Sequence, residues 1–403
     1  MSTILHLDLD AFFCAVEELH DPSLTGKPFA VGGRPEERGV VASCSYAARA
    51  QGVRSAMPMG RALRQCPELI IVPPQRSRYS HMSQQVMDRL HNLAPLVEQI
   101  SIDEAFVDIS DLCPDSNISS RLKVESLDTF ESVAAGIGRK IQRQIMDELG
   151  LPCSVGIASN KLVAKIATET GKKGARGSSA PAALTVIEAG REAEFLSPLP
   201  VSMLWGVGPK TEEKLSSLGI HTIGQLATAG AENLAALFGE NGRQMWHHAR
   251  GIDERPVSPE HTAKSISQET TFSRDISDDK TLERTLKELS VEVGKNLRRE
   301  KLAGTTIKIK LRWPDFTTLT RQATLPAATD LDEEIFQTAL GLLRKTREPG
   351  APLRLVGVGV SGLGAPARQM ELWGAQTEKQ RKIQSVIDDL QARFGDSIIK
   401  KGR

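Results

Sequence analysis

The chain of 403 residues exceeds what a single ordinary hydrophobic core supports, so its length predicts two to four domains. Charged residues make up 25% and hydrophobic residues 40% of the sequence, as in folded globular proteins, which excludes wholesale disorder and a membrane protein. The 51 Lys and Arg residues balance the 50 Asp and Glu residues, so any nucleic-acid role must come from local basic patches.

The N-terminal segment predicts a buried strand over residues 3–9, followed by an amphipathic helix. Asp8 therefore lies at the end of a strand. Residues 22–74 show few regular hydrophobic patterns and are rich in arginine. We interpret them as an inserted lobe that faces phosphate groups. The alternative is an ordinary solvated surface. Inside this lobe, Tyr46 and Arg49 lie three residues apart and share a face of a short helix.

Two adjacent carboxylates, Asp103 and Glu104, interrupt strand-like sequence between residues 97 and 109. Acidic residues rarely interrupt a strand without a chemical reason. If this strand lies beside the one that ends at Asp8, the three carboxylates form a pocket of hard oxygen ligands. Such a pocket suits Mg²⁺, because this ion binds few carboxylates together with substrate phosphates.

The next predicted elements are a helix over residues 130–149, a strand over 153–158 and a helix over 160–167. The last helix carries Lys161 in its first turn, where the helix dipole disfavours a cation unless an anion offsets it. Lys161 is therefore either a phosphate contact or a plain surface lysine. The basic, Gly- and Ser-rich residues 171–179 predict a loop or linker that closes the first domain.

A small helical region then extends to about residue 251. At its centre, apolar residues alternate with Gly206 and Gly208 just before a helix that carries Lys210. Glycines let the backbone approach an anion closely and turn amide N–H groups toward it. The pattern resembles the helix-hairpin-helix, a sequence-independent binder of the DNA backbone, although a G-x-G before a helix is often only a tight turn.

The third unit has the predicted order strand, helix, strand, strand, helix, strand. The strands are expected at residues 265–272, 305–312, 317–325 and 353–361, and the helices at 282–299 and 331–347. In the second strand, apolar residues alternate with Lys308, Lys310 and Arg312, so period-two geometry places these cations on one face. A sheet with one cationic face is suited to lie along a phosphate backbone.

The sequence after residue 362 begins with Gly and Pro and ends in a predicted helix over residues 377–394. Between them, Gln369, Leu372 and Trp373 form a short peptide with two large apolar anchors, which is typical of a docking motif. Alternatively, Leu372 and Trp373 pack back onto the third unit.

Four of these stretches occur in the order of the successive motifs of Y-family DNA polymerases and resemble them, with the bacterial DinB or DNA polymerase IV branch the most similar. They are Asp-Leu-Asp-Ala-Phe-Phe at residues 8–13, Tyr-Ala-Ala-Arg at 46–49, Ser-Ile-Asp-Glu-Ala at 101–105 and Asn-Lys-Leu-Val-Ala-Lys-Ile-Ala at 160–167. The resemblance covers residues 1 to about 362. It implies template-directed DNA synthesis past damaged bases, with low fidelity and without a proofreading domain.

The fold that the resemblance implies is an α+β, multidomain right-hand polymerase. Its parts would be the palm (residues 1–12 and 75–170), the fingers (13–74), the helical thumb with the helix-hairpin-helix (171–251), a linker (252–263), a βαββαβ little finger (264–362) and a C-terminal tail with a clamp-binding motif (363–403).

The resemblance assigns metal binding and catalysis to Asp8, Asp103 and Glu104, with the backbone carbonyl of Leu9 as a further ligand. It implies two Mg²⁺ ions, for which Mn²⁺ substitutes, and these would lower the pKa of the primer 3′-hydroxyl and neutralise charge on the phosphates. Asp10 lies beyond the metal position of the motif, and we expect it to be structural.

The implied partners are a deoxynucleoside triphosphate (dNTP), primer-template DNA and the sliding clamp, the β subunit. The residues that match dNTP contacts are Phe12, Phe13, Ser43, Tyr46, Arg49 and Lys161. Phe13 matches the aromatic steric gate, whose ring clashes with a 2′-hydroxyl; core packing is the alternative. The predicted DNA contacts are Gly206, Gly208, Lys210, Lys308, Lys310 and Arg312, and the predicted clamp contacts are Gln369, Leu372 and Trp373, with Trp where Phe is commoner.

Two departures from the family pattern stand out. A Ser-Cys-Ser run at residues 43–45 replaces the usual Thr-Ala-Asn, and its hydroxyls remain able to donate to phosphate. Residues 171–183 replace a shorter Lys-Pro-Asn-Gly turn, which leaves the boundary between palm and thumb open.

Three competing interpretations remain. A catalytically silent relative that acts as a DNA-binding scaffold in a mutagenesis complex would lack the acids, which are all present here. A nucleotide cyclase also carries paired acids but would not need the glycine hairpin or the cationic strand. A template-independent transferase of one fixed nucleotide, deoxycytidylate, would carry the same motifs.

The five cysteines include no C-x-x-C pair, which argues against a disulfide framework or a zinc site and for a reducing compartment. No apolar run is long enough to span a bilayer, and the N-terminus enters a strand directly, without a basic region before an apolar stretch, so we expect no secretory signal. We therefore expect a cytoplasmic monomer that does not bind membranes.

Overall fold

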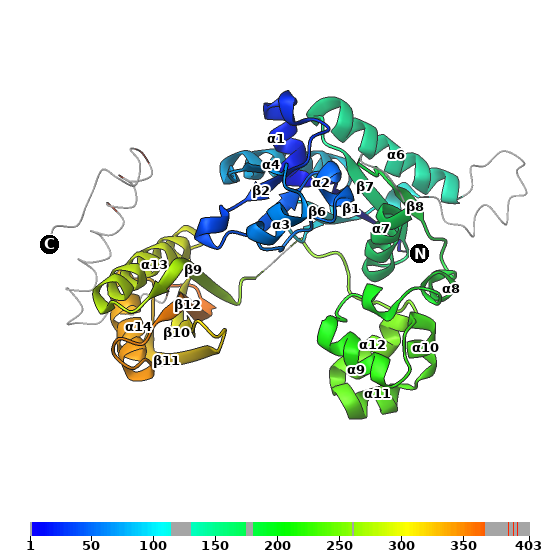
Figure 1. The fold of residues 1–403 in the computed structure, drawn as a ribbon. Helices are drawn as coiled ribbons and strands as arrows, with labels where there is room; N and C mark the ends of the chain where they lie inside the picture. Colours follow the sequence, from blue (N-terminus) through cyan, green and yellow to red (C-terminus); the bar gives the residue numbers. More distant parts are fainter. Residues whose placement is uncertain are drawn as a thin grey trace, which may run out of the picture. The chain divides into compact units, whose positions relative to one another are not determined.

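The structure, a computed structural model, describes residues 2–113, 130–174, 180–259 and 262–366, together with three single positions beyond them. The chain forms two compact units, one of residues 1–35 and 39–261 and the other of residues 36–38 and 262–403 (Figure 1). In the described ranges, no helix combines the length and the apolar character that crossing a membrane requires.

The centre of the first unit is a five-stranded sheet in the order β5-β6-β1-β7-β8. Its strands are β1 (Ile4–Leu9), β5 (Val97–Gln99), β6 (Glu104–Asp108), β7 (Cys153–Ala158) and β8 (Leu184–Val186). β1 pairs with β6 and β7, antiparallel to both, and all of its residues are buried. The register places Asp8 opposite Glu104, so the sheet itself brings two predicted metal ligands together.

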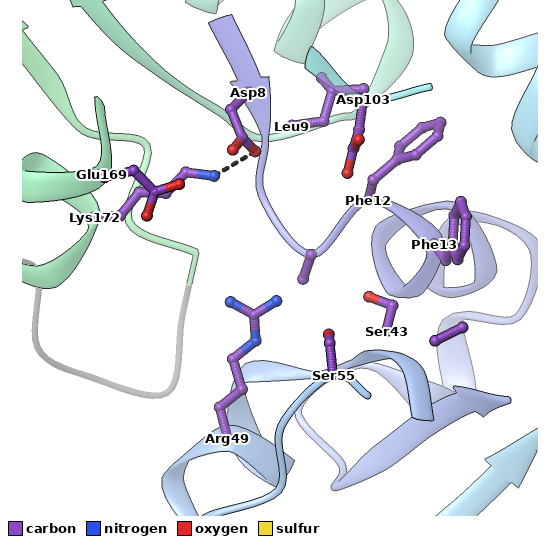
Figure 2. Close-up of a pocket in the computed structure, with 12 residues that line it drawn as sticks. Asp8, Leu9, Phe12, Phe13, Ser43, Arg49, Ser55, Asp103, Glu169 and Lys172 are labelled. Atoms are coloured by element: carbon purple, nitrogen blue, oxygen red, sulfur yellow. Dashed lines mark hydrogen bonds and ion pairs between the residues drawn. The ribbon is translucent and has the colours of Figure 1, made fainter. Parts of the chain in front are cut away.

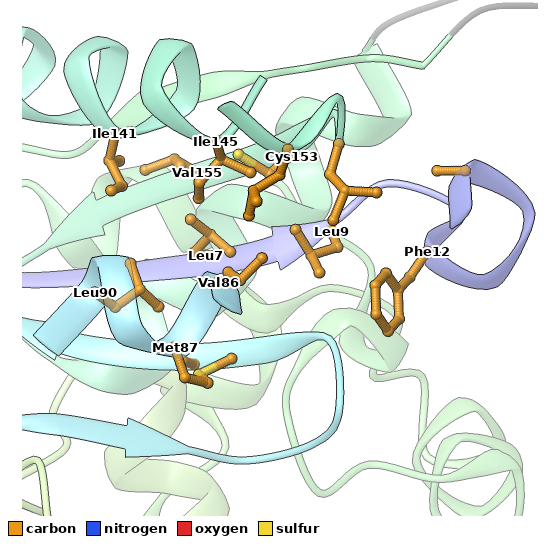
Figure 3. Packing of buried hydrophobic residues seen from close by; sticks show 14 of the residues in the cluster. Leu7, Leu9, Phe12, Val86, Met87, Leu90, Ile141, Ile145, Cys153 and Val155 are labelled. Carbon is orange, nitrogen blue, oxygen red and sulfur yellow. The ribbon is translucent and has the colours of Figure 1, made fainter. Parts of the chain in front are cut away.

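Helices pack on both faces of this sheet. They are α1 (Phe12–His20), α4 (Arg76–Leu93) and α6 (Phe130–Leu149) on one face and α7 (Lys161–Gly174) on the other. Because side chains alternate along a strand, Leu7 and Leu9 pack into the core with α4 and α6, whereas His6 meets Thr168 of α7 (Figure 3). Each fully buried Leu or Ile contributes roughly 1.5–3 kcal/mol. This core therefore fixes the position of β1 and of the acidic side chain of Asp8 near its end.

A lobe of short elements is inserted between α1 and α4. Its three-stranded sheet has the order β3-β2-β4, and its elements are β2 (Phe29–Gly32), β3 (Val41–Cys44), β4 (Ile70–Val72), α2 (Tyr46–Ala50) and α3 (Met59–Gln65). Buried residues such as Val41, Cys44 and Met59 give the lobe a small core of its own. The Ser45 hydroxyl accepts the Ala48 N–H at 3.2 Å, so α2 begins with the predicted Tyr-Ala-Ala-Arg motif.

The helical region that follows α7 shares its core with the sheet. Its helices are α8 (Glu192–Leu196), α9 (Pro209–Ser217), α10 (Ile223–Thr228), α11 (Ala231–Phe238) and α12 (Glu240–Ala249). Leu204, Leu215 and Leu234 of this region belong to one buried cluster with Phe106 of β6 and Leu162 of α7. Elsewhere in the first unit and its inserted lobe, short 3-10 helices occur at Pro22–Leu24, Pro35–Glu37, Ser110–Leu112 and Val201–Met203.

The second unit confirms the predicted βαββαβ order. Its elements are β9 (Ser265–Ile276), α13 (Asp279–Arg299), β10 (Ala303–Arg312), β11 (Thr318–Thr329), α14 (Asp332–Thr346) and β12 (Leu353–Gly364), with the sheet order β11-β10-β12-β9. Ile307, Ile309 and Leu311 of β10 are fully buried against the two helices. Lys308 and Lys310 lie on the other face, where they line a shallow groove, so the predicted two-faced strand is confirmed.

The loop predicted over residues 171–179 is wrong for its first part. Residues 171–174 are the last turn of α7, and residues 175–179 lie outside the described residues. Glycine disfavours a helix interior by about 1 kcal/mol. The ion pairs of Lys172 with Asp8 and Asp10 stabilise this last turn of the helix. The predicted tail peptide with Gln369, Leu372 and Trp373, and the helix after it, also lie outside the described residues.

Candidate active site

The end of β1 is fixed to the turn that carries the acidic pair. The Leu9 N–H donates to the Asp103 carbonyl at 3.0 Å, and the Ser101 hydroxyl accepts the N–H groups of Asp103 and Glu104 at 3.3 and 3.1 Å. After β1, Ala11 has a φ of 48°, a left-handed conformation that turns the chain sharply from β1 into α1. These bonds hold both acidic segments at one edge of the sheet.

One pocket opens at this edge (Figure 2). Its lining comes from Asp8, Leu9, Ala11, Phe12, Phe13, Ala42, Ser43, Arg49, Ser55, Asp103, Glu169 and Lys172. Asp8 and Asp103 lie on the sheet side, and Arg49, Ser43 and Ser55 approach from the inserted lobe. The pocket thus joins acids of one segment to a cation and hydroxyls of another.

Three carboxylates gather beside the end of β1. One oxygen each of Asp8, Glu104 and Glu169 lies within 4.8 Å of the others, and Asp103 lines the same pocket. A set made only of carboxylate oxygens fits a hard divalent cation such as Mg²⁺. Glu169 was not predicted from the sequence.

Two lysines of α7 neutralise these acids. Lys172 Nζ donates to Asp8 Oδ1 and lies 3.3 Å from Asp10 Oδ1, and Lys165 Nζ donates to Glu104 Oε2 at 2.5 Å. Asp10 also accepts from the Ser154 hydroxyl at 3.0 Å, as a structural residue would. Lys172 was not predicted from the sequence, because a Gly-Lys-Lys-Gly run favours a loop.

A signal for Lys172 was nevertheless present in the sequence. Positions 161, 165, 169 and 172 are spaced by three or four residues, so they share one helical face if the helix extends past Gly171.

The electrostatics of the acids follow from burial and from these partners. Burial opposes ionisation of Glu104, but the neighbouring His6 and Lys165 outweigh it and lower its pKa to about 2. Burial raises the pKa of Asp8 to about 7 against the effect of Lys172. Burial also lowers the pKa of His6 to about 4, so this imidazole is neutral at pH 7. A cation in the pocket would therefore favour the ionised form of Asp8.

Several predicted dNTP contacts lie in the pocket. Phe12, Phe13, Ser43 and Arg49 line it, and the Arg49 guanidinium lies 4.7 Å from the centroid of the Tyr46 ring. The Phe13 ring stacks on Tyr79 with centroids 4.2 Å apart, and the Tyr79 hydroxyl donates to Glu17 at 2.7 Å. The ring of Phe13 is therefore held in one orientation.

Lys161 is not brought to this pocket. It is 6% exposed, and its Nζ donates to both oxygens of Glu98 at 3.1 and 2.8 Å. The alternative of a plain surface lysine is therefore wrong, and the pocket-lining lysine of α7 is Lys172 instead.

The predicted DNA contacts lie in two separate places. In the first unit, Gly206 has a φ of 98°, which favours glycine, and neither Gly206 nor Gly208 has an atom within 4 Å of an added Cβ. The hairpin backbone is therefore open to a ligand just before Lys210. In the second unit, Lys310 pairs with Glu269 at 2.8 Å and the Arg312 Nε donates to the Thr318 hydroxyl at 2.9 Å.

Comparison with known proteins identifies the class. Residues 7–169 match the impB/mucB/samB family, residues 189–220 match the helix-hairpin-helix motif of that family and residues 263–372 match its C-terminal domain. The chain belongs to this family, the Y-family of DNA polymerases, and is a DNA-directed DNA polymerase. The resemblance inferred from the sequence motifs is confirmed.

Full-length relatives identify the branch. DNA polymerase IV of Desulfatibacillum aliphaticivorans is 42% identical, over 98% of this chain and 95% of the relative. DNA polymerase IV 1 of Bacillus subtilis (strain 168) is 36% identical, over 99% of this chain and 92% of the relative. Among solved structures, a Y-family DNA polymerase chimera has a TM-score of 0.76, covers 90% of this chain and 99% of its own and is 24% identical, which confirms the predicted fold.

Proposed function

We propose that the chain is a translesion DNA polymerase. It adds dNTPs to a primer 3′ end on a DNA template, with low fidelity and without proofreading. The observation that carries this proposal is one pocket in which the acids Asp8 and Asp103, the cations Arg49 and Lys172 and the ring of Phe13 lie together. Acids for metal ions, cations for phosphates and a ring for the sugar are the parts that nucleotidyl transfer needs.

The metal ligands proposed are Asp8, Asp103, Glu104 and the Leu9 carbonyl, with Glu169 as an additional carboxylate of the same cluster. When bound, two Mg²⁺ ions, for which Mn²⁺ substitutes, lower the pKa of the 3′-hydroxyl and neutralise charge at the α-phosphate. The buried β1 core keeps the Asp8 and Leu9 oxygens at fixed positions.

The dNTP phosphates are assigned to Arg49 and Lys172, with the Ser43 and Tyr46 hydroxyls as further donors. Lys172 replaces Lys161 in this assignment because it lines the pocket. Its ammonium is held by Asp8 and Asp10, which keeps it beside the position of the triphosphate. Cations at Asp8 would compete with this ion pair and release Lys172 toward the phosphates.

Selection of the deoxy sugar is assigned to Phe13. Its ring lies in the pocket wall and cannot turn aside without losing its stack on Tyr79. A 2′-hydroxyl on the sugar would therefore meet a rigid obstacle.

The domain roles follow the predicted division, with one change. Residues 1–12 and 75–174 would be the palm, since α7 continues to Gly174. The inserted lobe would be the fingers, the helical region the thumb, and the second unit the little finger. The hairpin amides and the Lys308, Lys310 and Arg312 face would hold primer-template DNA, and the C-terminal peptide would bind the sliding clamp.

The alternatives differ in what they do to primers. Membership of the polymerase family removes the nucleotide cyclase. A silent scaffold would bind DNA without extending it, and a deoxycytidyl transferase would add the same nucleotide opposite every base.

Primer extension with Mg²⁺ tests the proposal. Four undamaged templates that differ in one base, and one adducted template, are each supplied with single dNTPs, with and without the sliding clamp. We expect the base added to follow the template and extension to pass the adduct. Extension that ignores the template, or that stops at the adduct, would contradict the proposal.

A further inference from the structure

The first turn of α7 is capped from a distant segment. The first N–H groups of a helix have no partners inside it. The Val163 N–H donates to Asn160 Oδ1 at 3.0 Å, but the Leu162 N–H donates to Asp253 Oδ2 at 3.1 Å. Asp253 belongs to the connector that leaves α12, so the start of α7 is tied to the exit of the helical region.

Arg255 holds this cap in place. Its Nε and Nη2 donate to the two oxygens of Asp253 at 2.7 and 2.9 Å, and the Asp253 side chain is only 1% exposed. Burial alone would raise the pKa of Asp253, but these bonds hold it below its usual value. A bidentate guanidinium-carboxylate pair fixes direction as well as distance.

Arg255 also contacts the proposed DNA-binding hairpin. Its guanidinium lies 4.7 Å from the centroid of the Trp205 ring, and Trp205 directly precedes Gly206. The Trp205 ring also lies 6.3 Å from that of Phe106, on the strand that begins with Glu104. Contacts therefore run without a break from the hairpin through Trp205, Arg255 and Asp253 to α7.

α7 then carries this connection to the active site. Lys165, Glu169 and Lys172 project from it to the acids at the end of β1. The shared hydrophobic core joins the helical region to the sheet, but apolar contact does not depend on direction. The charged pair of Asp253 and Arg255 is directional, and it therefore sets the angle at which the hairpin meets α7.

We propose that Asp253 and Arg255 form a clasp that couples the hairpin's grip on DNA to the alignment of the primer terminus at the carboxylates. Both are positioning residues, since neither lines the pocket. The inference rests on the proposed function, in which the hairpin holds DNA. Loss of the clasp leaves the DNA-binding amides and the acids intact but lets their relative position vary, which slows the chemical step.

The test measures kcat and the KM for primer-template separately in the full-length protein. Arg255→Ala is expected to lower kcat about tenfold with the KM for DNA within about twofold of wild type, because misalignment acts at the transition state. Arg255→Lys keeps the charge but loses the bidentate fork and the stack, so it is expected to restore little activity. It also serves as the folded variant if thermal unfolding shows that Arg255→Ala is unstable.

Arg250→Ala is the matched control. Arg250 is a nearby exposed cation whose guanidinium also lies over a tryptophan ring, 4.6 Å from the centroid of Trp246, and no ion pair of it occurs among the described residues. We expect its kcat to stay at the wild-type value. Combining Trp205→Ala with Arg255→Ala should be no worse than the more severe single variant, because both break the contact between Arg255 and the hairpin.

Two results would overturn the clasp: a kcat of Arg255→Lys within twofold of wild type, or effects of Trp205→Ala and Arg255→Ala that multiply. Wild-type extension in the same assay tests the proposed function independently, so the two failures are distinguishable.

Discussion

The two cationic regions of the molecule differ in how far their lysines are buried and paired with acids. In the first unit, Lys165 and Lys172 are largely buried; Lys172 is bonded to Asp8 near the end of β1 and Lys165 to Glu104 at the start of β6. In the second unit, Lys308 and Lys310 stand on an open sheet face, and the ion pair of Lys310 with Glu269 is exposed. The first arrangement fixes charges at set positions, and the second supplies charge without fixed geometry.

This difference fits the tasks proposed for the two regions. Phosphoryl transfer depends on charges held at fixed positions around the reacting atoms, because reorganisation costs rate. Holding a DNA backbone of any sequence depends on the number of cations, and counterion release makes it sensitive to salt. Variants of the two regions should therefore differ in whether they change the rate of catalysis or the affinity for DNA.

Asp103→Ala should nearly abolish extension. Losing a metal ligand removes several kcal/mol of transition-state stabilisation, which corresponds to about 10³-fold or more in kcat. Primer extension under single-turnover conditions measures this loss. DNA affinity should stay at the wild-type value, and activity within tenfold of wild type would show that Asp103 is not a ligand.

Phe13→Ala should weaken sugar selection. Removing the ring that stacks on Tyr79 opens space for a 2′-hydroxyl, so discrimination between dNTP and ribonucleotide should fall by about 100-fold. Incorporation of each nucleotide opposite one template base gives the ratio of kcat/KM values. Incorporation of dNTP should persist, and equal discrimination in wild type and variant would remove the steric gate.

Lys172→Met and Lys161→Met should separate a phosphate contact from a structural ion pair. A charge-assisted bond of about 1.5–3 kcal/mol predicts a rise of roughly 10- to 100-fold in the KM for dNTP in Lys172→Met. Lys161→Met leaves the buried Glu98 without its cation, which costs about 3–5 kcal/mol of stability. Lys172→Met also leaves the buried Asp8 and Asp10 without their cation, so thermal unfolding should show a loss of stability in both variants, whereas steady-state kinetics should show a raised KM for dNTP only in Lys172→Met. A raised KM for dNTP only in Lys161→Met would restore Lys161 as the phosphate ligand.

Replacing both Lys308 and Lys310 by Ala should weaken DNA binding with little effect on kcat at saturating DNA. Two lost phosphate contacts predict a decrease of about 2 in the slope of log K against log salt. Fluorescence anisotropy at several salt concentrations measures it. Glu269→Gln is the matched control, since it frees Lys310 and should strengthen binding; an unchanged slope in the double variant would exclude this face.

The sequence predicted the elements around the site well, because periodicity reports which face of a strand or helix is buried. Asp8 and the Asp103-Glu104 pair could be placed at strand ends, and the three cations of β10 on one face. Glu169, Lys165 and Lys172 were missed as site residues. Their role depends on acids that lie between 61 and 164 residues away in sequence.

Local patterns and motifs were therefore enough to predict the family, the order of the elements and the acids at the strand ends. Which lysine of α7 lines the pocket became visible only with the helix packed against the sheet. Lys161 faces Glu98, and Lys172 faces Asp8, although both lie on one helix. A buried charged side chain needs an opposite charge beside it. Which residue supplies that charge depends on packing and strand register, and not on distance along the chain.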